Sequence, residues 1–332
     1  MDGVLQTMVN EKIGPGERAL AFVQAFCAQT GSSSACAFRT YPDALECALR
    51  TAGVAQGSLV AVSPLSPSEY RDAIQKTGAR MVMVDIDRET GCPDERLVQE
   101  SGAQVLMLYE NKGTLPVRYN EETTFAECCD YGEITIIEDI SESIGSAVGE
   151  EFSAGKLGQI VVCAVEEDSV VSAAGGSVVA ASGDFSTVLR ENRPSKYLRM
   201  PDLNAALGTV QLLNMQENMA RRRDITATYK QSLGRTRHRQ FGLNLMDFSS
   251  NASAFSVFLD CRPEEVVKFA QKNGVPVRQS FENCLLRDYE GDAFESFPAA
   301  APYYFRTVDF PLYPFLKASE VDMISKVIAH LP

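Results

Sequence analysis

The chain has 332 residues, 45% of them hydrophobic, and a formal net charge of −13 at pH 7. This length and hydrophobic content suffice for one large domain and one smaller domain, each with its own core. The acidic excess argues against general binding to nucleic-acid backbones, which depends on clustered lysine and arginine side chains. We therefore predict a globular protein with no nucleic-acid partner.

The amino-terminal stretch MDGVLQTMVNEK lacks the basic and apolar regions of a secretory signal, and no stretch reaches the roughly 18 apolar residues of a membrane span. We expect a soluble, cytoplasmic protein with no membrane partner. Nine cysteines without a C-x-x-C pair, among them the adjacent Cys128 and Cys129, fit a reducing compartment better than a disulfide framework. With His238 and His330 as the two histidines, we expect neither a metal site nor a histidine-dependent catalytic triad.

Short apolar runs alternate with helical patterns from residue 20 to residue 185, which is typical of a mainly parallel sheet with crossover helices. Between the first two runs, a start signal at Ser66 and a stop at Gly78 enclose an amphipathic helix and predict one β–α–β unit. The predicted fold class is therefore α/β. The expected strands are residues 59–63, 81–85, 105–109, 134–138, 160–165 and 177–181.

From Asp202 to about Leu233, apolar residues recur at three- and four-residue intervals. This spacing predicts one long amphipathic helix with Asp202 as its N-cap, and Arg221–Arg223 is interpreted as its solvated end. A helix of this length usually bridges domains. We predict a large α/β domain with flanking helices over residues 1–233 and a small C-terminal α+β domain over residues 234–332.

Acidic residues are frequent in the segments that follow the predicted strands. Ligands of open α/β sheets bind at the carboxyl ends of the strands, so these segments are the candidate functional positions. An excess of carboxylates there would make a cleft electronegative and favour a cation or an amine as ligand; a solvated loop is the alternative. The acidic residues concerned include Asp85, Asp87, Glu138, Asp139, Glu142, Glu166, Glu167 and Asp168.

Five segments stand out for their order and spacing: GARMVMVDIDRETG at 78–91, ITIIEDISESIG at 134–145, KLGQIVVCAV at 156–165, LRMPDLNAALGTVQL at 198–212 and DFPLYPFLKASEVDMISKVI at 309–328. Together they resemble the DegT/DnrJ/EryC1/StrS family of sugar aminotransferases that depend on pyridoxal 5′-phosphate (PLP). The resemblance runs nearly end to end and implies the fold type I architecture, a homodimer, and chemistry on nucleotide-linked keto-sugars in polysaccharide or antibiotic biosynthesis.

The resemblance places the cofactor-binding positions of the family on this chain. The carboxylate that contacts the pyridinium nitrogen falls on Asp139, although the residue type alone fits a helix N-cap equally well. A glutamine that contacts the ring hydroxyl falls on Glu142. The phosphate-binding turn falls on Thr40, Tyr41 and Pro42, where Pro42 has no N–H and Tyr41 replaces a glycine.

The remaining family positions are also altered. The aromatic residue that covers the ring falls on Pro67, and the asparagine supplied by the second subunit falls on Tyr197. The lysine that forms the imine falls on Asp168 or Ser169, and a one-residue deletion leaves that choice open. Neither side chain is an amine, so neither forms a Schiff base. Lys156 is the nearest lysine, and it matches a surface lysine of the family.

Two hypotheses follow for function. The first is a degenerate, catalytically inactive member that binds no cofactor and acts as a binding or regulatory protein, as a homodimer or as a heterodimer with an active paralogue. The second is an enzyme that binds PLP non-covalently through Asp139, or one that modifies nucleotide sugars by other chemistry. There Asp139, Glu142 and Asp168 would supply acid–base groups. A dinucleotide-binding protein is disfavoured because no G-x-G-x-x-G motif follows the first strand.

Overall fold

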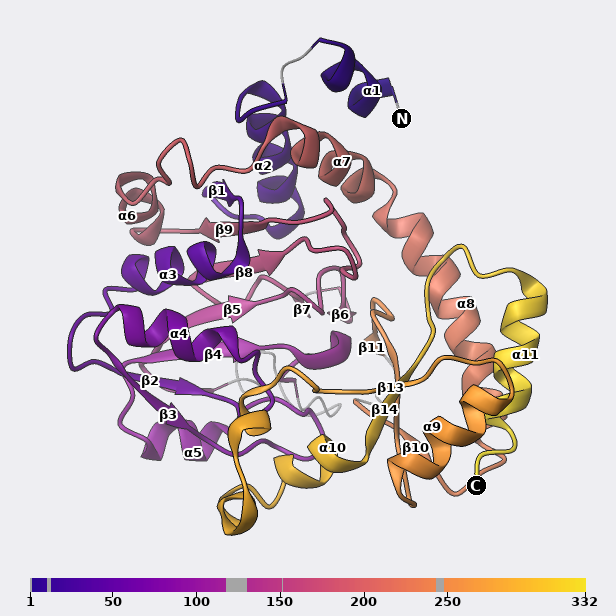
Figure 1. Ribbon diagram of the computed structural model, residues 1–332. Helices are drawn as coiled ribbons and strands as arrows, with labels where there is room; N and C mark the ends of the chain where they lie inside the picture. The colour runs from indigo at the N-terminus through magenta and orange to yellow at the C-terminus, as the bar shows by residue number, and fades with distance from the viewer. Residues whose placement is uncertain (1, 11–12, 118–129, 151, 243–247) are drawn as a thin grey trace.

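The computed structural model describes residues 2–10, 13–117, 130–150, 152–242 and 248–332 (Figure 1). A seven-stranded sheet forms its centre, in the order β1-β9-β8-β5-β4-β2-β3. Within these ranges, no helix is both long and apolar enough to cross a membrane. Cys128 and Cys129 lie outside the described residues. The strands are β1 (Ser34–Phe38), β2 (Leu59–Val62), β3 (Arg80–Met83), β4 (Val105–Tyr109), β5 (Thr135–Asp139), β8 (Ile160–Ala164) and β9 (Ser177–Ala181).

All six strands expected from the sequence are present, and the sheet is mainly parallel, as predicted. Strands β3, β2, β4, β5 and β8 are parallel neighbours, whereas β9 runs antiparallel to β8 and β1 runs antiparallel to β9. Strand β1 was not predicted, because its residues SACAF contain no β-branched residue and only one aromatic residue.

Helices cover both faces of this sheet, which explains why its strands read as continuous apolar runs. In β8, Val161 and Cys163 face the core that includes Phe22 and Phe26 of α2, whereas Ile160 and Val162 face the core beneath α3 and α4. The helices of this part are α1 (Asp2–Val9), α2 (Glu17–Thr30), α3 (Tyr41–Thr51), α4 (Glu69–Lys76), α5 (Glu95–Glu100), α6 (Phe185–Glu191), α7 (Asp202–Leu213) and α8 (Met215–Leu233).

The predicted single helix from Asp202 to Leu233 is two helices. The chain leaves helical geometry at Asn214 (φ −93°, ψ 2°), and α8 sets off in a new direction (Figure 1). The expected N-cap role of Asp202 is also wrong, because Pro201 precedes the helix and Asp202 is its first residue. The Asp202 carboxylate instead accepts hydrogen bonds from the backbone N–H groups of Gly16 (2.8 Å) and Ala19 (2.9 Å). It therefore caps the N-terminus of α2, where the unpaired backbone N–H groups attract a carboxylate.

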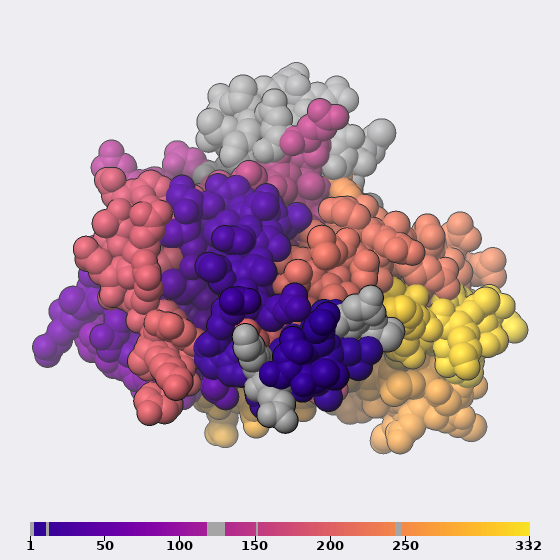
Figure 2. Space-filling view, turned by 90° about the horizontal axis from the view of Figure 1, so that it is seen from above, coloured from indigo at the N-terminus to yellow at the C-terminus, as the bar shows by residue number. Residues whose placement is uncertain are grey.

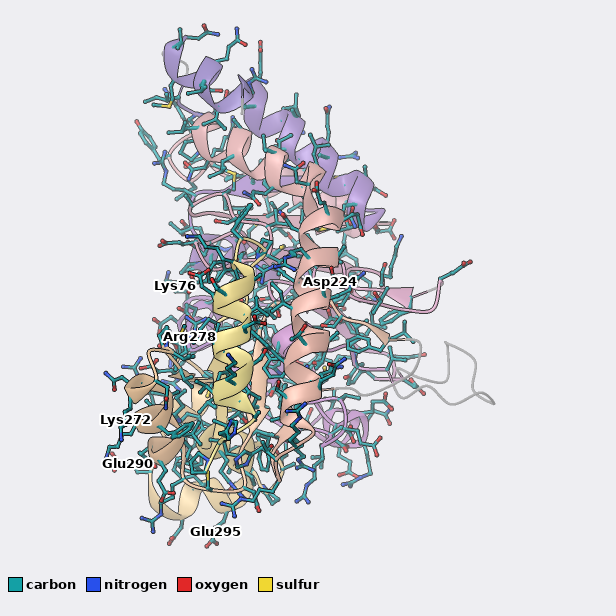
Figure 3. The ribbon with its side chains drawn as sticks, turned by 90° about the vertical axis from the view of Figure 1, so that its right-hand side faces the viewer. Lys76, Asp224, Lys272, Arg278, Glu290 and Glu295 are labelled. Carbon is teal, nitrogen blue, oxygen red and sulfur yellow. The ribbon has the colours of Figure 1, made fainter. Side chains whose placement is uncertain are left out.

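The carboxyl-terminal part forms an antiparallel four-stranded sheet in the order β10-β12-β14-β13, with helices packed against it. Its core includes Phe255, Val257 and Val308, and α8 and α11 run side by side over it (Figure 3). This arrangement fits the expected small α+β domain, while the boundary after residue 233 stays a prediction. The elements are β10 (Arg239–Gln240), β12 (Phe255–Phe258), α9 (Pro263–Lys272), β13 (Arg278–Gln279), α10 (Ala300–Arg306), β14 (Thr307–Phe310) and α11 (Ala318–Ile328).

The basic run Arg221–Arg223 is not the solvated helix end expected from the sequence. Arg222 is buried, and its guanidinium donates hydrogen bonds to the backbone carbonyls of Ala252 (3.3 Å) and Leu312 (2.9 Å). Arg223 donates to the carbonyl of Ser250 (2.8 Å). These bonds satisfy carbonyls of irregular backbone segments and fasten α8 to the small sheet.

A third, small sheet lies beside this junction. It contains β11 (Phe248–Ser249), β6 (Ala147–Val148) and β7 (Phe152–Ser153), all paired antiparallel. Seen from above, α1 and α2 occupy the middle of the molecular face, with the segment around α6 on one side and α8 and α11 on the other (Figure 2).

Candidate functional site

A cleft of about 350 Å³ lies where the carboxyl ends of β4, β5 and β8 meet β13 and β14 of the small sheet. It occupies the edge at which ligands of such sheets bind. Most of the positions that the resemblance assigned are in its wall. The lining includes Tyr41, Pro67, Tyr109, Lys112, Glu142, Asp168, Ser169, Arg278, Phe281 and Asp309.

Asp139, the last residue of β5, lies beneath the floor of the cleft and is fully buried. One carboxylate oxygen accepts the hydroxyl groups of Tyr41 and Tyr70, the latter at 2.8 Å. The other oxygen accepts the backbone N–H of Ser141 at 3.0 Å and the Ser141 hydroxyl. Two donors on each oxygen fill the roughly four acceptor positions of a carboxylate. The alternative role as a helix N-cap is not observed, because a turn follows Asp139.

The tyrosines around Asp139 remain protonated at neutral pH. Burial, followed by the nearby Asp139 charge, raises the pKa of Tyr41 and of Tyr70 well above the ordinary range. Burial also raises the pKa of Asp139, and the hydrogen bonds from Ser141, Tyr41 and Tyr70 oppose this shift. The phenols are thus hydrogen-bond donors to this carboxyl group.

The predicted phosphate turn is the first turn of α3. Thr40 is the N-cap, and its hydroxyl oxygen accepts the Asp43 N–H at 3.3 Å while the hydroxyl contacts the Asp43 carboxylate. Pro42 has no N–H to offer. A carboxylate at this helix terminus occupies the region of positive potential that would otherwise attract an anion.

The turn after β8 carries the two candidates for the family lysine position. Both Asp168 and Ser169 line the cleft, so the structure leaves the choice between them open. The Ser169 hydroxyl donates to the Ala164 carbonyl at 3.2 Å, and the Asp168 carboxylate pairs with Arg278 at 3.1 Å. Lys156 is exposed next to Gly31 and does not line the cleft.

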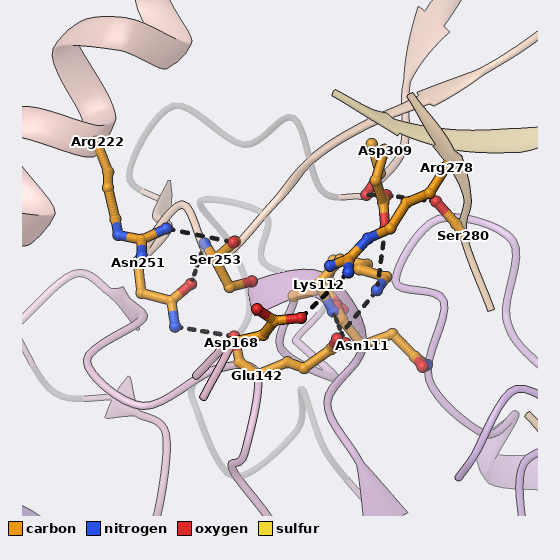
Figure 4. A network of polar contacts seen from close by, with 12 residues as sticks. Asn111, Lys112, Glu142, Asp168, Arg222, Asn251, Ser253, Arg278, Ser280 and Asp309 are labelled. Carbon is orange, nitrogen blue, oxygen red and sulfur yellow. Dashed lines mark hydrogen bonds and ion pairs between the residues drawn. The ribbon is translucent and has the colours of Figure 1, made fainter. Parts of the chain in front are cut away.

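Lys112 is the main cleft residue whose role the sequence analysis missed (Figure 4). Its ammonium lies 3.0 Å from a Glu142 oxygen and 3.4 Å from an Asp309 oxygen, and its backbone N–H donates to Glu142 at 2.8 Å. Burial lowers the pKa of Lys112, but Asp309 and Glu142 outweigh burial and raise it overall. At neutral pH Lys112 is therefore an ion-paired ammonium and not a nucleophilic amine.

Asp309 completes this cluster from β14 of the small sheet. One of its oxygens accepts the hydroxyl groups of Ser256 and Ser280, and the other faces Lys112. Although burial opposes ionisation, Lys112 and the two serines lower the pKa of Asp309. We call Lys112, Glu142 and Asp309 the Lys112 cluster; it joins the end of β4 and the turn after β5 to β14.

The carboxylates expected to make the cleft electronegative differ in their surroundings. Glu142 and Asp168 are neutralised by Lys112 and Arg278, and Glu167 does not line the cleft. The Glu166 carboxylate accepts the Gly176 N–H at 3.3 Å. Lys112 could have been noticed in the sequence, since it follows a predicted strand, whereas Arg278 and Asp309 enter the cleft only because the small sheet docks there.

Other acidic residues at the strand ends hold the backbone. Asp85 accepts the N–H groups of Ala299 (2.8 Å) and Ala300 (2.9 Å) and thus caps α10. Glu138 accepts the N–H groups of Gly155, Leu157 and Gly158 at 2.6–2.9 Å. These carboxylates are structural groups, which explains much of the acidic pattern of the sequence.

The last two predicted positions differ in placement. Pro67 lines the cleft, and the small-domain segment at Cys284 covers it through an isolated bridge. Tyr197 is 82% exposed and does not line this cleft. It lies on a loop that is held at the end of β1 by the hydrogen bond from the Arg39 N–H to the Leu198 carbonyl. Its predicted contact with a second subunit stays a prediction.

Glu110 is a buried acid that provides a pH-dependent prediction. Burial, together with the charge of neighbouring Glu138, raises the pKa of Glu110 well above its ordinary value. The fold thus favours protonated Glu110. The resulting stabilisation is complete at pH values below about 4.3, the pKa of a glutamate in the unfolded chain, and it is lost as the pH rises through the pKa of Glu110 in the folded chain. We expect Glu110→Gln, which imitates the protonated acid, to be increasingly more stable than the wild type from pH 5 towards pH 8.

Urea denaturation at several pH values measures this difference in the free energy of unfolding. The exposed Glu133 supplies the control, since Glu133→Gln should show a nearly constant difference from the wild type. A Glu110→Gln difference that stays flat, or shrinks as pH rises, would contradict the assignment.

The residues present do not fit PLP. The two residues that the resemblance places at the imine position, Asp168 and Ser169, carry no amine, the Asp139 acceptor positions are occupied by the chain's own donors, and the first turn of α3 carries a carboxylate. Nor does any group of three His, Cys, Asp or Glu side chains in the described ranges form a candidate metal site.

Comparison with known proteins shows the relationship of this chain. The model of the DegT/DnrJ/EryC1/StrS aminotransferase family matches residues 1–329. The spore coat polysaccharide biosynthesis protein SpsC of Bacillus subtilis is 24% identical over 374 aligned positions, which cover 98% of this chain and 92% of SpsC.

Solved structures show the same fold. The aminotransferase TlmJ from Streptoalloteichus hindustanus superimposes with a TM-score of 0.84 at 20% identity, covering 99% of this chain and 94% of TlmJ. DesV from S. venezuelae, solved in complex with a ketimine intermediate, gives 0.84 at 18% identity, covering 99% and 92%. The predicted fold class and family resemblance are confirmed. The chain belongs to the DegT/DnrJ/EryC1/StrS aminotransferase family.

Proposed function

We propose that this chain is a catalytically inactive member of its family, which uses the cleft to bind a small molecule without forming an imine. The observation that carries this proposal is that the lysine of the cleft is ion-paired and that the turn after β8 contains no lysine. Lys112 is held as an ammonium by two carboxylates, and the turn after β8 offers Asp168 and Ser169 where an imine-forming lysine is required.

The charge of the cleft supports a cation or an amine as the ligand. Its two basic residues, Lys112 and Arg278, are already paired with carboxylates. Glu69, Glu166 and Glu282 also line it, and none of them forms an ion pair among the residues that the structure describes. The remaining charge is negative and attracts positive ligands.

The proposed setting is cytoplasmic polysaccharide or nucleotide-sugar biosynthesis, and the name of SpsC places that protein in spore coat polysaccharide biosynthesis. We further propose a homodimer, in keeping with the exposed apolar residues Leu5 and Met8 of α1 and the exposed Tyr197. Light scattering of the purified chain tests self-association, and a monomer that dimerises only with an active paralogue would favour the heterodimer.

Absorption spectroscopy with PLP tests the central proposal. We expect the wild-type chain mixed with a slight molar excess of PLP to show no imine band, and borohydride treatment to leave no pyridoxyl group on any lysine of the cleft by peptide mass spectrometry. An adduct on Lys112 would instead support an active PLP-dependent enzyme. Adducts confined to exposed lysines such as Lys156, at the level seen with unrelated proteins, leave the proposal intact.

A further inference from the structure

We propose that the first turn of α3 closes the former cofactor site with the chain's own side chains, Tyr41 in the place of the pyridine ring and Asp43 in the place of the phosphate. This inference deepens the proposed function and rests on it. We call Tyr41 and Asp43 the plug, because their side chains would block the cofactor site. The missing lysine is then not the only reason for the lack of cofactor binding.

The position of Tyr41 is the first argument. Its ring is half-buried, packs against the core beneath α3 and lines the cleft, while its hydroxyl reaches the fully buried Asp139. Tyr41 therefore lies between the cleft and the carboxylate that pyridoxal enzymes use to bind the ring nitrogen. A pyridine ring would have to displace Tyr41 before it could contact Asp139.

The hydrogen-bond inventory of Asp139 is the second argument. Tyr41 and Tyr70 share one oxygen, and Ser141 supplies both donors to the other. A fifth donor would find no free acceptor position. The acceptor positions of the Asp139 carboxylate are thus occupied by donors of the same chain.

Electrostatic repulsion at the start of α3 also disfavours a bound phosphate. The Asp43 carboxylate and the Thr40 side chain bond each other at the start of α3, and Pro42 removes a backbone donor from the same turn. A phosphate placed there would meet a like charge at hydrogen-bond range and lose the N–H groups that normally bind it.

The floor of the remaining cleft follows from this arrangement. A ligand in the 350 Å³ space meets the phenol of Tyr41 in place of a carboxylate, with Tyr109 and the Lys112 cluster in the walls. The plug therefore turns the base of an ionic cofactor site into a neutral aromatic surface, on which ligands with an apolar face pack well.

Pyridoxamine 5′-phosphate is the probe for the plug, because it has no aldehyde and its binding needs no lysine. We expect Tyr41→Ala combined with Asp43→Asn to bind it at least about tenfold more tightly than the wild type in calorimetric titration, since a charged hydrogen-bond acceptor and the ring space are freed. The matched control Tyr41→Phe with Asp43→Asn keeps the ring and should bind clearly more weakly than Tyr41→Ala with Asp43→Asn, because the ring still fills the pyridine position.

Lysine restoration gives a second, independent readout. We expect Ser169→Lys and Asp168→Lys, made singly, to form no imine with PLP, because the ring position stays filled by Tyr41. An imine in either single variant would overturn the plug, as would equal affinities of the two double variants for pyridoxamine 5′-phosphate. An imine in the wild-type chain would instead overturn the proposed function. Circular dichroism of each variant confirms folding, and Tyr41→Ser replaces Tyr41→Ala if the latter unfolds.

Discussion

Replacing Lys112 by methionine will lower the free energy of unfolding by about 3–5 kcal/mol, the range observed when one partner of a buried ion pair is removed. The variant leaves the Glu142 and Asp309 carboxylates facing each other without their shared cation, whose side chain is 12% exposed in the wild type. Ser256 and Ser280 still donate to Asp309, so Glu142 bears most of the loss. Urea denaturation at pH 7, followed by circular dichroism, measures the change.

A surface ion pair of the same chain provides the matched control. Arg96 and Glu100 lie 2.8 Å apart within α5, with side chains 69% and 58% exposed. Arg96→Met should cost less than about 1 kcal/mol, because water already screens this pair. If Lys112→Met cost no more than Arg96→Met, the Lys112 cluster would not be the buried connection between the two sheets that we describe.

The second large effect is expected from Gly176, which lies between the turn that carries Asp168 and Ser169 and the first residue of β9. Its φ of +112° is a conformation that residues with a side chain rarely adopt, and an added Cβ would lie 2.9 Å from the Phe38 carbonyl oxygen and 2.6 Å from the Met200 side chain. Gly176→Ala therefore combines backbone strain with a contact to another main chain. We expect a loss of at least about 3 kcal/mol in the free energy of unfolding.

Gly102 provides a control in which a substitution causes backbone strain without a close contact. It also has a positive φ, +68°, but an added Cβ would meet nothing within 4 Å. Gly102→Ala should therefore lose only about 1–2 kcal/mol, the cost of the left-handed conformation alone. Equal losses for the two variants in thermal or urea unfolding would show that the close approach to Phe38 has no energetic role.

The local parts of the fold could be predicted from the sequence. Strands buried on both faces leave continuous apolar runs, which is why β8 and β9 were found with nearly their observed bounds. β1 was missed because its small residues carry a weak strand signal. The break at Asn214 was missed because the apolar spacing continues across it, and periodicity alone does not report a change of helix direction.

The site was predictable only in part. The resemblance identified Asp139, Glu142 and Tyr41 as positions of interest, and all three lie at the cleft. The partners that set their chemistry come from elsewhere: Tyr70 from α4, and Lys112 and Asp309 from either side of the cleft. Such partners are fixed by the docking of elements distant in sequence, and no local pattern of residues encodes that docking.

The pairing of β1 with β9 has a consequence for biosynthesis. The amino-terminal strand finds its single sheet neighbour at residues 177–181, and the cap of α2 is supplied by Asp202, 186 residues after Gly16. As the ribosome releases the chain, the parallel strands can begin to assemble, while residues 17–38 wait for partners that emerge later. Until residues 177–202 have been made, the growing chain therefore exposes an apolar segment without its partners, and chaperone capture at this stage would fall on residues 17–38.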